Sequence, residues 1–582
     1  MATLQKKKTN GIYYWYIVES VRVNGKPRPK VLAYLGKAEN LLEKLKGKTP
    51  LSSKSYEYGP AAVVDKIINK IGIIDIINSK ILVDKKEPMV VRNNLNLGQT
   101  LALIMHQRAL CPDSKRAFHL WAKRTFLPFM YEFDPENADS QHFWDMMDLV
   151  PEEAIPALEL EITKRIVNLF NIKPDLLLYD YTNFFTFIDT LNTKNTIAQR
   201  GKNKQKRNDL RQFCLALLVT RATKIPLFSD IYEGNKNDVR EFSDSIGRLR
   251  TRLEKLSLSF DDITLVFDKG NNSKNNFKKL DDLNYVASLS VHHHKELKEI
   301  PFSKLEPMVL RKDKNNKEVI LNALRVDDIA VWGIRRTAVI YFSQALYDGQ
   351  IRGINRALRE VKEKLEDLKE SCPASGGACG EGKLTSKSKP KKWTKELLER
   401  EVETIINRQF IRDIVDFKIK KSNSGFTFTY EISESKFNQL KSTVLGKRIL
   451  ITNRHDWSTQ EIILAYQGQS DVEFAFRQIK NPFHCCVRPQ FHWTDQKIKV
   501  HTFSCVLAYT ISALIEKTAR DNGFNYTIDE IFERLLEIRK VRYISPARGG
   551  ISPNVSKKYN IEWQLEQIED KNTEALFKVL MG

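Results

Sequence analysis

The chain has 582 residues, which exceeds the size of one compact domain and predicts about three to five folding units. Hydrophobic residues make up 42% and aromatic residues 10% of the sequence, which is enough for real cores and excludes wholesale disorder. Lys and Arg number 94 against 72 Asp and Glu, and this excess of +22 is typical of a protein with a polyanionic partner, although a Lys-rich solvated surface would give the same balance.

The first 170 residues contain a β-rich start and a long helical region. Within residues 1–50, two β-type runs between positions 10 and 36 flank Asn24-Gly25 and predict a β-hairpin. Residues 51–170 carry apolar side chains at spacings of three and four, which predicts helices. This helical region is either a DNA-binding domain or a packing domain, because no helix-turn-helix signature decides between them.

Residues 171–295 predict the first part of an α/β core. The apolar runs DLLLYDYTNFFTFID, FCLALLVT and IPLFSDIYEG predict three strands. An amphipathic helix, the strand ITLVFD, a short helix and the strand YVASLSV follow. Three strands, helix, strand, helix, strand is the order of a ribonuclease-H-like domain with a mixed five-stranded sheet and flanking helices, although many α/β domains share parts of it.

The remaining pattern predicts an interruption of that core. Residues 296–455 change to a β-leaning region, a charged helix and a Gly/Ser/Lys stretch, which we interpret as a large α+β insertion. The core resumes over residues 456–545, and residues 546–582 form a C-terminal tail.

Cysteine usage and hydropathy indicate the compartment. Seven cysteines are sparse, and their spacing repeats no disulfide or zinc framework. No run approaches the ~18 apolar residues of a membrane span, and the start MATLQKKKTNG lacks the apolar segment of a signal peptide. We therefore expect a reduced, cytoplasmic protein without a membrane segment.

Two aspartates stand out in the predicted strands. Asp180 lies inside the apolar run LLLYDYTN, and Asp268 ends the run TLVFD. A carboxylate in an apolar strand costs free energy unless a cation or hydrogen bonds compensate it. A strand-end cap or a turn acid is the simpler structural explanation, and it fits Asp268 well but Asp180 poorly.

A third polar element lies on the helix predicted at residues 466–480. At ~100° per helical residue, five side chains share a face about 80° wide: Tyr466, Gln469, Glu473, Arg477 and Lys480. Val472, Phe476 and Ile479 lie beside this face and can pack it onto the sheet. Such a face is usually only solvated, but here two strand acids precede it.

Two aspartates and one glutamate form a donor set for divalent cations. Their hard oxygens suit Mg²⁺ or Mn²⁺. Two such ions can activate a water or a 3′-hydroxyl and stabilise the leaving oxygen of a phosphoryl transfer. Tyr, Lys and Arg on the same helical face would then meet phosphates.

The helix resembles the Tyr-x2-Arg-x3-Glu-x6-Lys signature of cut-and-paste DDE transposases from bacterial and archaeal insertion sequences. Tyr466, Glu473 and Lys480 match at the required spacings, and that group also carries a large insertion before its glutamate. The blocks RNDLRQFCLALLV, IPLFSDIYEGNKNDVREF and RPQFHWTDQKIKVHTFSCVLA are similar to one branch of the group, so the resemblance extends over most of residues 10–520.

The resemblance implies a function and a set of partners. It implies a ribonuclease-H-like core in which Asp180, Asp268 and Glu473 bind two Mg²⁺ ions, with Mn²⁺ as a substitute. It also implies binding to terminal inverted repeats, DNA cleavage, joining of 3′-hydroxyl ends to target DNA, and a homodimer in a synaptic complex within a prokaryotic cytoplasm, at the nucleoid. Relatives often use a tryptophan of the insertion to stack a flipped base, for which Trp332 is a candidate by region.

One position departs from the signature. Its arginine is Gln469 here, which can hydrogen-bond a phosphate but brings no charge. We hypothesise that Arg477, on the same face, partly replaces the missing charge.

A basic loop follows the first predicted catalytic strand. It contains four closely spaced cations: Lys202, Lys204, Lys206 and Arg207. The loop is either a solvated surface segment or a contact to the DNA backbone, and its predicted place near the active-site edge favours DNA.

Two other functions remain open from the sequence. A nuclease or resolvase of the same fold would use the same acids for hydrolysis alone. A domesticated DNA-binding protein would need none of the three acids, yet all three are present.

Overall fold

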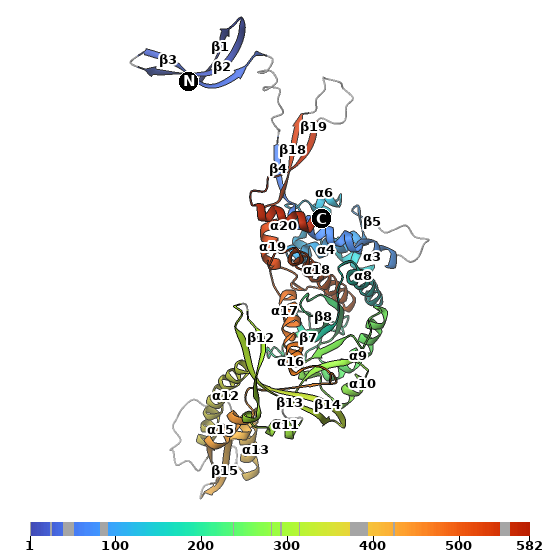
Figure 1. Cartoon of the computed structure of the whole chain (residues 1–582), viewed down its shortest axis with the longest axis vertical. Helices are drawn as coiled ribbons and strands as arrows, with labels where there is room; N and C mark the ends of the chain where they lie inside the picture. The colour runs from blue at the N-terminus through green and yellow to red at the C-terminus, as the bar shows by residue number, and fades with distance from the viewer. Residues whose placement is uncertain are drawn as a thin grey trace.

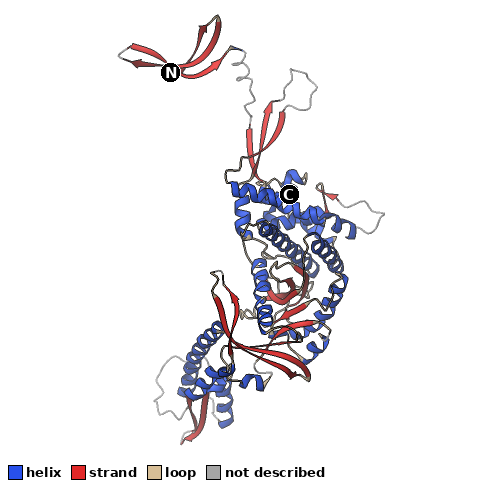
Figure 2. Cartoon of the chain, viewed as in Figure 1, coloured by secondary structure: helices blue, strands red, loops and turns tan. Residues whose placement is uncertain are grey.

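The structure is a computed structural model of the whole chain (Figure 1). It describes residues 2–23, 26–38, 52–81, 91–236, 238–280, 282–290, 294–313, 315–372, 394–422, 425–546 and 559–582. Figure 2 shows a helix-rich body around a mixed sheet, and a small sheet at the N-terminus that stands apart from the body.

The N-terminal unit is a three-stranded antiparallel sheet of β1 (Ala2–Thr9), β2 (Ile12–Val23) and β3 (Lys26–Gly36). The predicted hairpin corresponds to β2 and β3, although its Asn24-Gly25 turn lies outside the described residues. The sequence prediction missed β1, because its run of lysines hides the alternation of a strand. Asn10 and Gly11 join β1 to β2 with φ values of 49° and 79°, as a tight hairpin turn requires.

The body is built on a nine-stranded mixed sheet in the order β12-β13-β14-β17-β11-β10-β7-β8-β9. Its strands are β7 (Leu176–Thr186), β8 (Arg211–Thr220), β9 (Pro226–Glu233), β10 (Thr264–Phe267), β11 (Asn284–Leu289), β12 (Glu306–Lys312), β13 (Glu318–Val331), β14 (Ile334–Phe342) and β17 (Lys447–Thr452). All five predicted core strands form, as β7 to β11. Of these, β7, β10 and β11 are parallel to one another, and β8 is antiparallel to both β7 and β9.

Helices cover both faces of the core strands, which explains why β8 and β10 are apolar without alternation. On one face, Phe242 of α9 (Asp238–Lys255) packs on Tyr179 and on Phe267, beside α10 (Lys274–Lys279). Successive side chains of a strand point to opposite faces. Asp180 therefore points to the other face, on which α17 (Gln469–Ile479) packs against β7.

The helical region is part of the main core. Its helices are α2 (Gly59–Ile71), α3 (Ile73–Ile81), α4 (Leu97–Leu110), α5 (Phe118–Ala122), α6 (Leu127–Met130), α7 (Ser140–Asp148) and α8 (Ile155–Leu169). Of these, α2, α4, α7 and α8 contact α18 (Asp495–Asp521), and α3 contacts α2, α4 and α8. Almost every side chain of α4 is buried, including Arg108, so α4 has a packing role.

In the described part of the chain, α18 is the one helix long and apolar enough to cross a membrane by length and composition. However, 89% of its most apolar window is buried inside the protein. That burial accounts for its composition as a core helix.

The predicted insertion at residues 296–455 is divided between two bodies. Strands β12, β13, β14 and β17 extend the core sheet, and β17 pairs directly with β11. A separate hydrophobic cluster joins α12 (Gln344–Glu370), α13 (Lys395–Ile406), α14 (Ile411–Ile414), β15 (Val415–Ser422), β16 (Gly425–Ile432) and α15 (Glu434–Thr443). Strand pairing between distant segments leaves no local signal, so the sequence did not show that part of this segment joins the core sheet.

The C-terminal region is also structured, contrary to its interpretation as a tail. A second three-stranded sheet joins β4 (Ser52–Glu57), β18 (Arg539–Pro546) and β19 (Tyr559–Leu565). After α19 (Ile528–Leu535) and this sheet, α20 (Lys571–Met581) packs on α2 and α18 through buried Leu576 and Leu580. A short pair, β5 (Val91–Arg92) and β6 (Leu95–Asn96), precedes α4.

Candidate active site

Two neighbouring parallel strands bring Asp180 and Asp268 together. Tyr179 of β7 lies beside Phe267 of β10, so the next residue on each strand is an aspartate at the same level. Asp180 is half-buried within β7, whereas Asp268 follows the last residue of β10 and is exposed. The parallel register thus places both predicted acids at one edge of the sheet.

The environment of Asp180 opposes its ionisation. Burial raises the pKa of the Asp180 carboxyl to about 7, and the negative charges of Asp268 and Glu473 contribute to the rise. A hydrogen bond from the Tyr181 backbone and the charge of Lys204 act in the opposite direction. Asp180 therefore lies within electrostatic range of both other acids and of the basic loop.

The helix predicted at residues 466–480 is two helices, α16 (Thr459–Gln467) and α17, separated at Gly468. A Cβ at Gly468 would lie 2.9 Å from the Ala465 carbonyl oxygen and 3.3 Å from a Leu178 methyl carbon. Glycine thus permits the close approach of this junction to β7. Lys480 caps the C-terminus of α17.

Three side chains of this segment contact the strands that carry the aspartates. The Tyr466 hydroxyl donates to Asp268 Oδ1 at 3.0 Å, and Lys480 Nζ donates to Thr182 Oγ1 at 2.5 Å. Gln469 Nε2 donates to the backbone carbonyl of Tyr179 at 3.4 Å. All three contacts lie on β7 or at the end of β10, as a shared helical face predicts.

These contacts occur in a partly desolvated setting. Burial lowers the pKa of the Lys480 ammonium, and burial followed by the charge of Asp268 raises the pKa of the Tyr466 hydroxyl. Arg448 of β17 donates a hydrogen bond from Nη1 to the Tyr466 hydroxyl at 3.4 Å. Sequence reasoning missed Arg448, because β17 was assigned to the insertion.

Glu473 projects from an otherwise anchored helix. Val472, Phe476 and Ile479 are buried, as their spacing predicted, while Glu473 is exposed. The other acid of this helix, Asp471, accepts a hydrogen bond from the Ala222 backbone amide at 3.1 Å. Of these two acids, Glu473 contributes to the Asp180 pKa and Asp471 is engaged elsewhere.

The three acids have the donor chemistry of a site for hard divalent cations. In the described ranges, no Lys or Arg forms an ion pair with Asp180, Asp268 or Glu473. No group of three or more His, Cys, Asp or Glu side chains among the described residues is close enough together to hold a metal ion. Burial is the main cause of the raised pKa of Asp180, and the negative charges of Asp268 and Glu473 add to it; a divalent cation would offset both effects.

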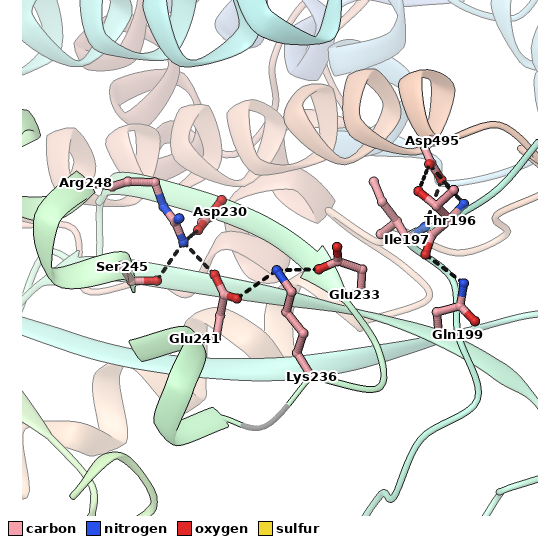
Figure 3. Close-up of polar contacts among 10 residues, drawn as sticks. All are labelled: Thr196, Ile197, Gln199, Asp230, Glu233, Lys236, Glu241, Ser245, Arg248 and Asp495. Carbon is pink, nitrogen blue, oxygen red and sulfur yellow. Dashed lines mark hydrogen bonds and ion pairs between the residues drawn. The ribbon is translucent and has the colours of Figure 1, made fainter. Parts of the chain in front are cut away.

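A neighbouring group of acids provides a contrast (Figure 3). Arg248 of α9 pairs with Asp230 at 2.5 Å and with Glu241 at 2.6 Å, and Lys236 bridges Glu241 and Glu233 at 3.3 and 2.7 Å. These acids are balanced by cations of their own chain. These ion pairs within the chain indicate a structural role for the three acids.

The basic loop is anchored at its base. Backbone amides of Thr196 and Ile197 donate to the Asp495 carboxylate of α18 at 2.9 to 3.0 Å, and the Thr196 hydroxyl donates to it at 2.5 Å (Figure 3). The Gln199 side chain returns to the Thr196 carbonyl at 2.8 Å. These bonds fix the start of the loop against the helical body.

The four predicted loop cations are exposed but differ in their surroundings. The positive charge of Lys204 favours the ionised form of Asp180, and that of Lys206 favours the ionised form of Glu360 on α12. Arg207 forms a two-point ion pair with Asp209, with nitrogen–oxygen distances of 2.9 and 2.8 Å. Lys202 and Lys204 are thus freer to meet a phosphate than Arg207 is.

Two further sequence candidates have local contacts. The Arg477 guanidinium lies 5.4 Å from the ring centroid of Phe474 on the same helix, and it is exposed. Trp332 lies at the turn between β13 and β14, where its ring packs 5.0 Å from that of Phe277. The contact with Phe277 is that of a packing residue.

Comparison with known proteins gives one match of sequence. Residues 3–50 match the family model described as IS1634 family transposase, N-terminal domain. This match supports a transposase. No curated protein matches the chain.

Two solved structures show limited similarity. The piggyBac transposase synaptic complex with hairpin DNA, determined by cryo-EM, is 9% identical, with a TM-score of 0.37 over 84% of this chain and 82% of that chain. The Mos1 transposase paired-end complex with left transposon end is 10% identical, with a TM-score of 0.15 over 35% of this chain and 61% of that chain. Neither likeness carries weight for fold or function at these TM-scores.

Proposed function

We propose that this chain is a transposase that cleaves DNA at the terminal inverted repeats of its own element and joins the 3′-hydroxyl ends to target DNA. The observation that carries the proposal is that Asp180 and Asp268 lie at the same level of the adjacent parallel strands β7 and β10, beside the Tyr466 and Lys480 contacts, with the charge of Glu473 reaching Asp180. The N-terminal family match supports the same function independently of the site.

The proposed core is ribonuclease-H-like. Its first support is the strand order β9-β8-β7-β10-β11, in which β8 is antiparallel to its neighbours β7 and β9, and β7, β10 and β11 are parallel to one another. Its second support is the position of the two aspartates on the adjacent strands β7 and β10. Helices α9 and α17 cover opposite faces of these strands. Such a sheet presents acids from adjacent strands and from one covering helix at a common edge.

In this proposal the three carboxylates hold two Mg²⁺ ions, for which Mn²⁺ can substitute. Bound ions would activate the attacking oxygen and stabilise the leaving oxygen of an in-line displacement. Asp180 must lose its proton to serve as a ligand, so metal binding and Asp180 ionisation are coupled. Tyr466 orients Asp268 through its hydrogen bond, and Lys480 places a positive charge beside β7.

The proposed substrates are duplex DNA ends and a duplex target, held by a homodimer in a synaptic complex of the prokaryotic cytoplasm. The net charge of +22 supports a polyanionic substrate. Lys202 and Lys204 are exposed and the charge of Lys204 reaches Asp180, so both are candidate phosphate contacts, together with Arg477 and Gln469.

The direct test uses purified protein, Mg²⁺ and DNA that carries the inverted repeats flanking the gene. Excision followed by strand transfer supports the proposal. Cleavage without joining would indicate a nuclease or resolvase, and binding without cleavage would indicate a DNA-binding protein that has lost catalysis.

The basic loop gives a prediction on binding. Replacing Lys202, Lys204 and Lys206 by Gln should reduce the slope of log K against log salt concentration by about 2 to 3, because each phosphate contact releases about 0.9 counterions. Fluorescence anisotropy of an end duplex between low and high salt measures the slope. Arg207→Gln is a single-charge control and should change the slope by clearly less than one third of this amount, because Asp209 already offsets that charge. An unchanged slope in the triple variant would refute DNA contact by the loop.

A further inference from the structure

The N-terminal sheet of β1, β2 and β3 exposes aromatic rings and lysines on both faces. On one face, Lys6 and Lys8 lie 4.6 and 5.4 Å from the ring centroid of Tyr13. Tyr13 is 48% exposed. The strand register places Tyr13 opposite Lys8, so this arrangement follows from the pairing of β1 with β2.

The opposite face carries a cluster of three tyrosines. The ring of Tyr34 lies 5.1 Å from that of Tyr16 and 5.9 Å from that of Tyr14, and Lys7 lies 5.6 Å from the Tyr16 ring. Tyr34 is 54% exposed, and Val31 on the same face is 46% exposed. Large rings that remain this open in a small sheet indicate a surface that contacts a partner.

The charge of this sheet identifies the chemistry of the partner. Residues 2–38 contain eight Lys and Arg but a single Glu. Tyrosine hydroxyls and lysine ammonium groups are donors for phosphate oxygens, and exposed rings are apolar surfaces for sugars and for the base edges in a groove. The combination fits a polyanion with aromatic components, which is nucleic acid.

The shape of the unit suits a duplex. Paired antiparallel strands can enter the major groove of B-form DNA, which admits a two-stranded β-ribbon. The sheet stands apart from the body in Figure 1, so its faces are not the wall of the catalytic core. In the helical region at residues 51–170, helix α4 is buried and therefore presents no comparable exposed surface to DNA.

We propose that the N-terminal β1–β3 sheet is the module that binds duplex DNA at the end of the element, a role that rests on the proposed transposase function. The lysines of β1 contact the phosphates, and the exposed tyrosines contact the groove or its rim. The family match ends at residue 50, which agrees with a unit that is separate from the catalytic core.

The test is end binding by the full-length protein in the presence of EDTA, so that cleavage plays no part. The variant Lys6→Gln/Lys7→Gln/Lys8→Gln should weaken binding of the flanking inverted-repeat duplex about 10- to 100-fold at physiological salt and reduce the salt slope by about 2 to 3. A second variant, Tyr13→Ala/Tyr34→Ala, should weaken binding about tenfold through loss of groove and sugar contacts, at an unchanged slope because no charge is removed. Fluorescence anisotropy measures the affinity and its salt dependence, and circular dichroism checks that each variant is folded.

The matched control removes three exposed lysines from helices of the body: Lys362, Lys571 and Lys578. It should bind nearly as the unaltered chain does. Normal affinity and slope in both N-terminal variants, or equal weakening in the control, would overturn the proposal. A loss of self-association with normal DNA affinity would also overturn it, by assigning the sheet to a second copy of the chain.

The two proposals fail in distinguishable ways. If the N-terminal variants bind normally while Asp180→Asn abolishes cleavage, the sheet proposal fails alone. If the unaltered chain neither binds nor cleaves the element's ends, the proposed function fails.

Discussion

Asp180→Asn should abolish DNA cleavage while DNA binding persists. The substitution keeps the size of the side chain but removes the charged ligand that links β7 to the proposed metal site. Because bound metal ions contribute several kcal/mol to the stabilisation of the transition state, the rate should fall by about 1,000-fold or more. Cleavage of an end duplex in Mg²⁺, together with anisotropy of the same duplex in EDTA, measures both effects.

Helix α17 supplies a matched pair of carboxylates for the same assay. Glu473→Gln should reduce cleavage to a similar extent, because Glu473 is a proposed metal ligand whose negative charge reaches Asp180. Asp471→Asn should leave cleavage nearly unchanged, because Asp471 bonds the Ala222 amide. Equal losses in both variants would mean that the helix is needed only for folding, and cleavage by Asp180→Asn at the normal rate would refute the assigned site.

The second large effect concerns stability and pH in the absence of divalent metal. The pKa of Asp180 is about 7 in the folded protein, against 3.8 as its ordinary value. A raised pKa means that this carboxyl's contribution to stability is complete below about pH 4 and is lost as the pH rises through 7. At ~1.4 kcal/mol per pKa unit, ionised Asp180 should destabilise the metal-free protein by about 2 to 4 kcal/mol at pH 8.

Asp180→Asn removes that cost. In EDTA it should unfold at higher temperature than the unaltered chain at pH 8, and the difference should shrink towards pH 5. Added Mg²⁺ should stabilise the unaltered chain and have little effect on the variant, because a ligand that binds only the folded state stabilises it. Thermal unfolding followed by circular dichroism checks this, and a variant less stable than the unaltered chain at pH 8 in EDTA would contradict the account.

The residues of the candidate site that have strong local signals could be singled out from the sequence. Asp180 was visible because a carboxylate interrupts an apolar run, and Asp268 because it ends one. The helical spacing of Tyr466, Glu473 and Lys480 was visible because a period of 3.6 residues places them on one face. The contacts of Tyr466 with Asp268 and of Lys480 with Thr182 agree with that spacing.

Other features depend on pairing between distant segments. Arg448 reaches Tyr466 because β17 inserts between β14 and β11, and no local pattern reports this arrangement. The Gly468 junction depends on the approach of Leu178 from β7. Strand β1 was missed because QKKKT lacks apolar alternation, and its pairing with the tyrosine-rich β2 defines it as a strand.

The most direct test of the central claim, that Asp180 is a metal ligand of the catalytic site, is a metal switch. Asp180→Cys replaces a hard oxygen by a softer thiolate, which binds Mg²⁺ poorly and softer divalent ions better. Cleavage of an end duplex should be lost in Mg²⁺ and partly restored in Mn²⁺, whereas the unaltered chain cleaves in both metals. Equal cleavage by Asp180→Cys in Mg²⁺ and Mn²⁺ would contradict the claim.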